Sequence, residues 1–290
     1  MQKNYKIGID IGGTKMIGVL LDGEKVITDC LLATPKDNTN HFFIMLKALV
    51  EPLLERARKD GAMVFGVGIS VAGVLDYTIG KMVFCPNIPI LNGLKILERA
   101  SKFISLPMVI DNDVKCFVRA EAEIGYRKKY KNVFGVAIGT GIGGGWYING
   151  DVYHGANGGA GEIGEIADFN TGVTLEAAYH NLMNKNPKDA AMQTILGDEL
   201  SKKAYEDFGN IFGIALANAV NLIDPEVIIV GGGVMESSHL FLDFARTKMH
   251  SLIASDKGKK MKILKSKLGA HACAIGAAML IERLKISETK

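Results

Sequence analysis

Two short segments rich in glycine and threonine each interrupt a run of strand-forming residues. The first is Gly12-Gly13-Thr14 and the second is Gly139-Thr140-Gly141. Glycine lets backbone N–H groups approach anionic oxygens without a Cβ in the way, and threonine adds a hydroxyl donor. Each segment therefore predicts a phosphate-binding turn, with an ordinary tight turn as the alternative. Neither fits the GxxxxGKS or GxxxxGKT pattern of a P-loop, and Gly141 to Gly145 lack the strand-to-helix context of a dinucleotide fingerprint.

Acidic and amide side chains end two of the predicted strands. Asp10 immediately precedes the first turn. A carboxylate beside a phosphate is unfavourable without a cation between them, so Asp10 predicts a Mg²⁺ site, held directly or through water; a turn-capping aspartate is the alternative. Asn112-Asp113 follows a predicted strand at 108–111. The aspartate suits a general base for a substrate hydroxyl, but both residues also suit the cap of the following helix.

A third set of polar residues lies outside the turns. Glu162 and Glu165 belong to the glycine-rich segment 158–165, and Glu176 follows further along the chain. Asn87 stands between the prolines of Pro86-Asn87-Ile88-Pro89. Carboxylates and amides with little bulk around them suit hydrogen bonds to sugar hydroxyls. The alternative for the glutamates is that they are solvated surface residues.

The elements that must position these residues form a pattern that occurs twice. Strand, Gly/Thr turn, strand, hairpin and strand run through 5–32, and the same order returns 127 residues later without a gap, so that Asn149-Gly150 falls on Asp22-Gly23. Both dipeptides suit a two-residue hairpin turn. A repeat of this period predicts two lobes of common design.

The remaining segments alternate between helix and strand, which predicts an α/β fold. The expected helices are 41–59, 113–124, 199–223 and 270–284. Pro52 is expected to kink or divide the first of them.

The composition is that of a soluble globular protein with room for two lobes, with 290 residues, 48% hydrophobic and 22% charged. The formal net charge of +3 gives no electrostatic reason to expect nucleic-acid or membrane binding. No signal-peptide pattern is present and no apolar run approaches the ~20 residues of a membrane span, so a cytoplasmic location is expected. The four cysteines lie far apart without a CxxC pair, which indicates neither a zinc knuckle nor a disulfide framework.

Taken in order, these motifs resemble those of the ROK family of sugar kinases, within the actin-like, sugar-kinase and Hsp70-type ATPase fold, and the resemblance runs nearly end to end. The matching positions are Asp10-Ile11-Gly12-Gly13-Thr14-Lys15, Gly73, Asp76, Gly80, Asn87, Asn112-Asp113, Gly139-Thr140-Gly141, Gly161-Glu162-x-Gly164, Leu175-Glu176-Ala177 and Gly231-Gly232-Gly233. The resemblance implies a two-lobed actin-like (ribonuclease H-like) α/β fold with a duplicated β-meander and the active site in the cleft between the lobes. The expected lobes are 1–117 plus 276–290, and 118–275.

The resemblance also implies roles for the polar residues. Asp113 is the expected catalytic base. The expected sugar ligands are Asn87, Asn112, Asp113, Glu162, Glu165 and Glu176. The expected ATP site comprises Asp10, Gly12, Gly13, Thr14, Lys15, Thr140, Gly141, Gly232 and Gly233, with Mg²⁺ near Asp10.

One departure from the family pattern concerns zinc. Family members usually carry a histidine after Gly-Glu-x-Gly, and it binds zinc together with three cysteines of a C-x-C-G-x-x-G-C run. Here Glu165 replaces that histidine and 166–174 contains no cysteine, so no zinc site is expected. Because the missing histidine normally contacts the sugar, Glu165 either contacts the sugar itself or is a surface replacement.

The implied reaction is transfer of a phosphoryl group from ATP to the 6-hydroxyl of a hexose or N-acetylhexosamine. N-acetylmannosamine is slightly favoured, then glucose, with allose and N-acetylglucosamine as further options. The alternatives are a non-catalytic, sugar-sensing ROK protein and an ATPase of the same fold. No helix-turn-helix of the kind that repressors carry is expected before the first strand, and the ATPase alternative does not account for the motif at Gly161 to Gly164. A homodimer is expected by analogy with the family.

Overall fold

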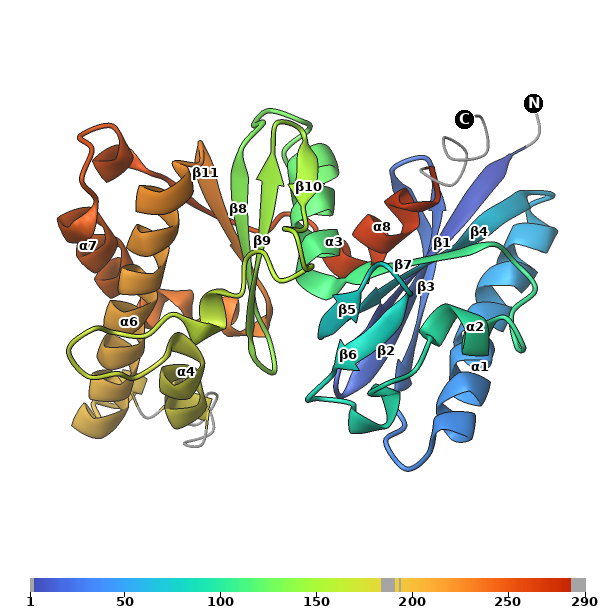
Figure 1. The fold of residues 1–290 in the computed structure, drawn as a ribbon, viewed down its shortest axis with the longest axis horizontal. Helices are drawn as coiled ribbons and strands as arrows, with labels where there is room; N and C mark the ends of the chain where they lie inside the picture. Colours follow the sequence, from blue (N-terminus) through green and yellow to red (C-terminus); the bar gives the residue numbers. More distant parts are fainter. Residues whose placement is uncertain (1–2, 184–190, 193, 283–290) are drawn as a thin grey trace. The chain divides into compact units, whose positions relative to one another are not determined.

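The computed structural model describes residues 3–183, 191–192 and 194–282. The chain divides into two compact units, whose elements are labelled in Figure 1. Unit 1 comprises Met1–Arg127, His154–Ala160 and Leu268–Lys290, and unit 2 comprises Lys128–Tyr153 and Gly161–Lys267. Within the described residues, no helix is both long and apolar enough to cross a membrane.

These units differ from the expected lobes at 118–127, 154–160 and 268–275, which all join unit 1. The reason is the packing of α3 (Asp113–Ala120) against α8 (Ala272–Met279). Ala120 shares a buried cluster with Ala274 and Ala278. A boundary inside α3 would cut this contact, so the whole helix belongs with unit 1.

The main sheet of unit 1 has the strand order β3-β2-β1-β4-β7. The first three strands form an antiparallel meander, to which β4 and β7 add in parallel. The strands are β1 (Asn4–Ile11), β2 (Lys15–Asp22), β3 (Lys25–Ala33), β4 (Met63–Val71) and β7 (Met108–Asn112), with a separate pair of β5 (Val74–Asp76) and β6 (Lys81–Phe84). Parallel strands end at the same edge, so β1, β4 and β7 bring Asp10, Ser70 and Asp111-Asn112 to one end of this sheet.

One face of the unit 1 sheet is covered by α1 (Thr39–Lys59). This helix is continuous across Pro52, so of the expected kink or division the division was wrong. Its buried face includes Phe42, Leu46, Leu49 and Leu53. Burying each such side chain contributes about 1.5–3 kcal/mol, and together they outweigh the ~3 kcal/mol that an internal proline costs.

The terminal helix α8, red in Figure 1, lies along β1 and β4. Its contact with β1 depends on Gly8, because a Cβ at that position would overlap the carbonyl oxygen of Ala274. The other short helical elements of unit 1 are η1 (Pro89–Leu91), α2 (Ile96–Ala100), the π-turn η2 (Glu121–Gly125) and η6 (Gly269–His271).

The sheet of unit 2 has the order β10-β9-β8-β11-β12. Its strands are β8 (Val133–Ile138), β9 (Ile142–Ile148), β10 (Asp151–Tyr153), β11 (Val227–Gly231) and β12 (Ile263–Lys265). The helices are α4 (Leu175–Met183), α6 (Glu199–Ile223) and α7 (Leu242–Leu252), with turns η3 (Ile163–Glu165), η4 (Gly233–Leu240) and η5 (Gly258–Lys260). An antiparallel meander is again extended by two parallel strands, which confirms the expected duplication.

The two meanders are not aligned without a gap, as the sequence had suggested. Four residues separate the paired Ile11 and Met16 in the first turn, whereas three separate Ile138 and Ile142 in the second. Because of this one-residue deletion, the residues of the next hairpin also correspond differently from the expected alignment. There the turn residues are Gly23-Glu24 in unit 1, not Asp22-Gly23, and Asn149-Gly150 in unit 2.

Candidate active site

Asp10 lies near the end of β1, with Ser70 beside it on the parallel strand β4. The Ser70 hydroxyl donates a hydrogen bond to Oδ1 of Asp10 at 2.9 Å. Burial, and then the negative charge of Asp113, raise the pKa of Asp10 to about 7, while Ser70 and Lys15 act in the opposite direction. Two carboxylates that disfavour each other's charge are a suitable environment for a cation, so the donor chemistry fits Mg²⁺.

The first Gly/Thr turn is fixed by Thr34, which follows β3. Its hydroxyl donates to the carbonyl of Gly12 at 2.7 Å, and its N–H donates to the carbonyl of Thr14 at 3.0 Å. A Cβ on Gly13 would lie 2.8 Å from the Cβ of Asn87, so the structure brings Asn87 directly against this turn. The predicted phosphate turn and one predicted sugar ligand are therefore neighbours.

Asn112 caps α3, as one of the two sequence interpretations required. Its Oδ1 accepts from the N–H groups of Val114 and Lys115 at 3.0 and 3.1 Å, and its Nδ2 donates to the carbonyl of Gly73 at 3.0 Å. An amide nitrogen carries two hydrogens, so one remains for another acceptor. Asn112 thus has a fixed orientation, and a hydrogen bond from its side chain lowers the pKa of the neighbouring Asp113.

Asp113 is the first residue of α3 and is partly exposed. Burial raises the pKa of its carboxyl, although the backbone N–H groups of Val114 and of Asp113 itself, the charge of Lys115 and the Asn112 side chain act the other way. A carboxylate whose proton affinity is raised accepts a proton more readily near neutral pH. The capping role falls to Asn112, and Asp113 keeps its side chain available.

A buried network that the sequence did not suggest lies just before this pair. Asp111 is 2% exposed and accepts hydrogen bonds from the Tyr77 hydroxyl at 2.7 Å and from the N–H of Asn112 at 2.8 Å. Nε2 of His154 lies 3.0 Å from both of its carboxylate oxygens. The buried Lys115 ammonium donates to the carbonyl of Gly158 at 2.8 Å. These contacts attach the segment His154–Ala160 to unit 1.

In unit 2, the predicted nucleoside loop lies against the end of β8. Gly232 has φ +98°, a left-handed value that favours glycine, and a Cβ there would overlap the carbonyl oxygen of Ile138. Ile138 is the residue before the second Gly/Thr turn. The structure therefore places the loop Gly231-Gly232-Gly233 beside the turn Gly139-Thr140-Gly141, so two of the motifs predicted to hold ATP are neighbours in unit 2.

Glu176, at the start of α4, also lies against the second turn. Its Oε2 accepts from the N–H of Ile142 at 2.8 Å. Glu162 immediately precedes η3, Glu165 is its last residue, and both are exposed. Within unit 2, the predicted sugar residue Glu176 thus contacts the predicted phosphate turn.

Comparison with known proteins decides the family. The sequence model of the ROK family matches residues 6–284. The chain belongs to the ROK family. It is 28% identical to the N-acetylgalactosamine kinase AgaK of Shewanella sp. (strain ANA-3), over 84% of this chain and 86% of that protein. It is 26% identical to the xylose repressor of Bacillus subtilis (strain 168), over 96% of this chain and 77% of that protein.

The fold of this ROK protein also matches a solved kinase structure. The ROK family glucokinase from Streptomyces griseus in complex with glucose and AMPPNP superposes with a TM-score of 0.81, at 26% identity, over 96% of this chain and 99% of that chain. The two-lobed actin-like α/β fold expected from the sequence is thereby confirmed. Family membership alone does not separate catalysis from sensing, because the ROK relatives include kinases and repressors.

The segment where the family pattern expects zinc ligands has another structure in this ROK protein. Ala167 and Thr174 form an isolated antiparallel bridge, and the N–H of Gly172 donates to the carbonyl of Asp168 at 2.8 Å. The turn is closed further by Oδ1 of Asp168, which accepts from the N–H of Asn170. No group of three or more His, Cys, Asp or Glu side chains in the described ranges could hold a metal ion. The absence of zinc stays a prediction.

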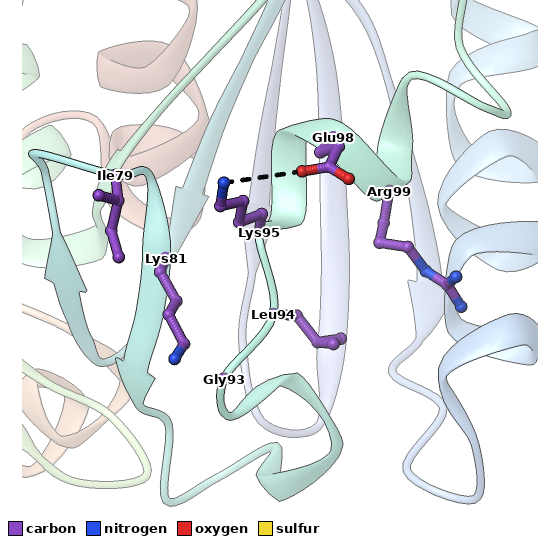
Figure 2. Close-up of a pocket in the computed structure, with 7 residues that line it drawn as sticks. All are labelled: Ile79, Lys81, Gly93, Leu94, Lys95, Glu98 and Arg99. Carbon is purple, nitrogen blue, oxygen red and sulfur yellow. Dashed lines mark ion pairs between the residues drawn. The ribbon is translucent and has the colours of Figure 1, made fainter.

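A pocket of about 430 Å³ in unit 1 contains none of the predicted site residues. Its lining residues are Ile79, Lys81, Gly93, Leu94, Lys95, Glu98 and Arg99 (Figure 2). Figure 2 shows that its cationic side chains do not converge on one point, and Lys95 faces Glu98 at 4.0 Å. This pocket is therefore not a candidate for the active site.

Proposed function

We propose that this ROK protein is an ATP-dependent sugar kinase that transfers the γ-phosphoryl group to the 6-hydroxyl of a hexose or N-acetylhexosamine. The observation that carries the proposal is the Asn112-Asp113 pair. Asn112 caps α3 and has a fixed amide, while the adjacent Asp113 has an available carboxylate with a raised pKa. A positioned hydrogen-bond donor next to a base is what phosphoryl transfer to a hydroxyl needs.

Asn87, Asn112 and Glu162 would hold the sugar hydroxyls, together with Glu176 and Glu165. Asn87 is supported by its position against Gly13, because a sugar held there is next to the first phosphate turn. Glu162 and Glu165 are exposed, so their carboxylates are accessible to a ligand. Charged and amide groups form directional hydrogen bonds with hydroxyls, which fixes the orientation of a sugar.

The ATP phosphates would lie at the two Gly/Thr turns, with the nucleoside near 231–233. The residues proposed to hold ATP at the first turn are Gly12, Gly13, Thr14 and Lys15. Those at the second turn and the adjacent nucleoside loop are Thr140, Gly141, Gly232 and Gly233. The exposure of Thr14, Lys15 and Thr140 supports their availability to a ligand. Asp10 would hold Mg²⁺, directly or through water, and the ion would neutralise charge on the phosphate oxygens.

In the proposed reaction, Asp113 accepts the proton of the sugar 6-hydroxyl as its oxygen attacks the γ-phosphorus. The new P–O bond forms to the sugar while the bond to the bridging oxygen of ADP breaks. The protein contributes mainly by orienting the hydroxyl and stabilising charge. N-acetylmannosamine stays slightly ahead of glucose as the proposed acceptor. Galactose-type N-acetylhexosamines deserve equal testing, since one relative is an N-acetylgalactosamine kinase.

The test is a coupled ADP-release assay with MgATP against a panel of hexoses and N-acetylhexosamines. The matched control is Asp113→Asn protein purified in parallel, which reports any contaminating kinase. We expect ADP release that depends on one or a few sugars and is absent from the variant. Sugar-independent or absent release from folded, ATP-binding protein would contradict the proposal.

A non-catalytic sugar sensor is the second candidate, because the relatives include the xylose repressor. The two functions differ in one measurement. A sensor would bind a sugar, as followed by calorimetry, without releasing ADP when MgATP is supplied.

A further inference from the structure

The carboxylate of Glu176 lies between two predicted binding motifs of unit 2. Its Oε2 accepts from the N–H of Ile142, which closes the second Gly/Thr turn, at 2.8 Å. A Cβ on Gly141 would lie 2.6 Å from its Oε1, and a Cβ on Gly164 would lie 3.2 Å from its Oε2. Gly164 belongs to the segment that carries Glu162. One side chain therefore contacts both the phosphate turn and the sugar motif.

Tyr179, on the same helix, holds the other end of this turn. Its hydroxyl donates to the carbonyl of Gly139 at 2.5 Å. The side chain is 0% exposed, and burial, together with the charge of Glu176, raises its pKa, so the hydroxyl stays protonated and keeps donating. The turn Gly139-Thr140-Gly141 is thus fixed by α4 at both of its ends.

The helix that makes these contacts is itself anchored in the core of unit 2. Leu175 and Leu182 are buried, and the ring of Tyr179 packs against that of Phe208 on α6 with the centroids 5.7 Å apart. The hydroxyl of Thr174 accepts from the N–H of Ala177 and so caps the first turn of α4. A helix held in this way can impose a geometry on the loop that it contacts.

We propose that Glu176 and Tyr179 are positioning residues that set the second turn in its phosphate-binding geometry, and that Glu176 links this turn to the sugar motif. The inference rests on the proposed function, because it assigns ATP phosphates to the turn. The carboxylate has about four lone-pair sites. It accepts from Ile142 at Oε2 and its Oε1 lies 3.1 Å from Nε2 of His180, so lone pairs are left for a sugar hydroxyl. Neither residue needs to touch the nucleotide, because each acts through the backbone of the turn.

The first test is Tyr179→Phe, with Tyr5→Phe as the matched control. Tyr5 is also buried and donates one hydrogen bond, to Asp60 at 3.1 Å, but it lies at the far end of β1 from the first turn. Binding of AMPPNP with Mg²⁺ is measured by calorimetry without sugar. We expect Tyr179→Phe to weaken it roughly 3- to 10-fold, as for the loss of one net hydrogen bond, and Tyr5→Phe to leave it within twofold.

The second test compares Glu176→Gln with Glu176→Ala. A glutamine oxygen can still accept from the N–H of Ile142, whereas alanine leaves that N–H without its partner. Rescue is therefore expected, with AMPPNP affinity near that of the parent for Gln and at least tenfold weaker for Ala.

The outcomes separate the inference from the proposed function. If neither Tyr179→Phe nor Glu176→Ala changes AMPPNP affinity while the parent shows sugar-dependent ADP release, the positioning role is overturned and the kinase stands. If Tyr179→Phe changes nucleotide affinity, sugar KM and thermal stability by the same amounts as Tyr5→Phe, the role of Tyr179 is structural and the inference also fails. A folded parent that does not bind AMPPNP overturns both.

Discussion

Nε2 of His154 lies 3.0 Å from both carboxylate oxygens of Asp111. This contact attaches the segment His154–Ala160 to β7, the strand that precedes the candidate base Asp113. Asp111 is 2% exposed and has the Tyr77 hydroxyl as a further partner. A buried carboxylate is stable only when its hydrogen bonds are made. The contact therefore supports the strand end that holds Asn112 and Asp113.

Replacing His154 by alanine is expected to destabilise the protein by about 1–3 kcal/mol, because Asp111 loses one partner in a buried position. The measurement is urea unfolding followed by circular dichroism. His41→Ala is the matched control, since its ion pair with Asp37 is exposed and should contribute nothing measurable. Equal unfolding midpoints for the two variants would contradict the role given to His154.

The stability of the protein is expected to fall in acid partly through Asp111. Burial acts to raise the pKa of Asp111, but the hydrogen bond and charge of His154 and the hydrogen bonds of Tyr77 and Asn112 outweigh it and lower the pKa. A carboxyl with a lowered folded-state pKa contributes stability above its unfolded value of about 3.9, and this is lost as the pH falls through the folded value. Unfolding free energies measured from pH 5 downward should fall more steeply for the parent than for Asp111→Asn. Parallel curves would show that Asp111 does not contribute.

Asp113→Asn is expected to lower turnover by a factor of about 10²–10⁴, the usual contribution of a general base, while sugar binding is largely kept. The asparagine keeps the size of the side chain but cannot take up the proton. Asp256→Asn, at an exposed ion pair with Lys259, is the matched control. Turnover within a few-fold of the parent, measured by ADP release, would exclude Asp113 as the base.

Asp10→Asn is expected to make the ligand-free protein more stable and inactive. Burial and the nearby charge of Asp113 disfavour the Asp10 carboxylate, and asparagine removes that charge. A gain of about 1 kcal/mol corresponds to a rise in melting temperature of about 1.5–2 °C for a chain of 290 residues. Scanning calorimetry without nucleotide measures the gain, and the ADP-release assay measures the loss. A variant that is less stable and still active would contradict both expectations.

Gly141→Ala and Gly139→Ala form a matched pair within one turn. A Cβ on Gly141 would lie 2.6 Å from Oε1 of Glu176, whereas a Cβ on Gly139 has open space around it. The first variant should displace the carboxylate and raise the KM for ATP about tenfold, and the second should leave it near the parent value. Equal KM values would show that this contact does not shape the turn.

Much of the fold was predictable because it depends on local patterns. The strand runs, the Gly/Thr turns and the long helix Glu199–Ile223 follow from β-branched, glycine and alanine-rich composition along the chain. The second Gly/Thr turn is one residue shorter than the first, and this was not predictable. The neighbouring glycines of the two repeats can be aligned with or without the deletion, and only the strand pairing of Gly135 with Gly145 decides between the two alignments. The continuity of α1 across Pro52 was not predictable, because the cost of a proline is local, whereas the burial that outweighs it is tertiary.

The sequence by itself determined the identity and order of the candidate site residues and the duplicated meander, since motifs and periodicity are properties of neighbours along the chain. Tertiary structure alone decided which of them meet. It assigned the cap to Asn112, placed Asn87 against Gly13, and put the carboxylate of Glu176 on the second turn. It also brought Thr34, His154 and Tyr179 into contact with residues that lie 22, 43 and 40 positions away in the chain. Those residues are Gly12, Asp111 and Gly139, respectively. Contacts over such separations arise from sheet register and helix packing, which no local pattern encodes.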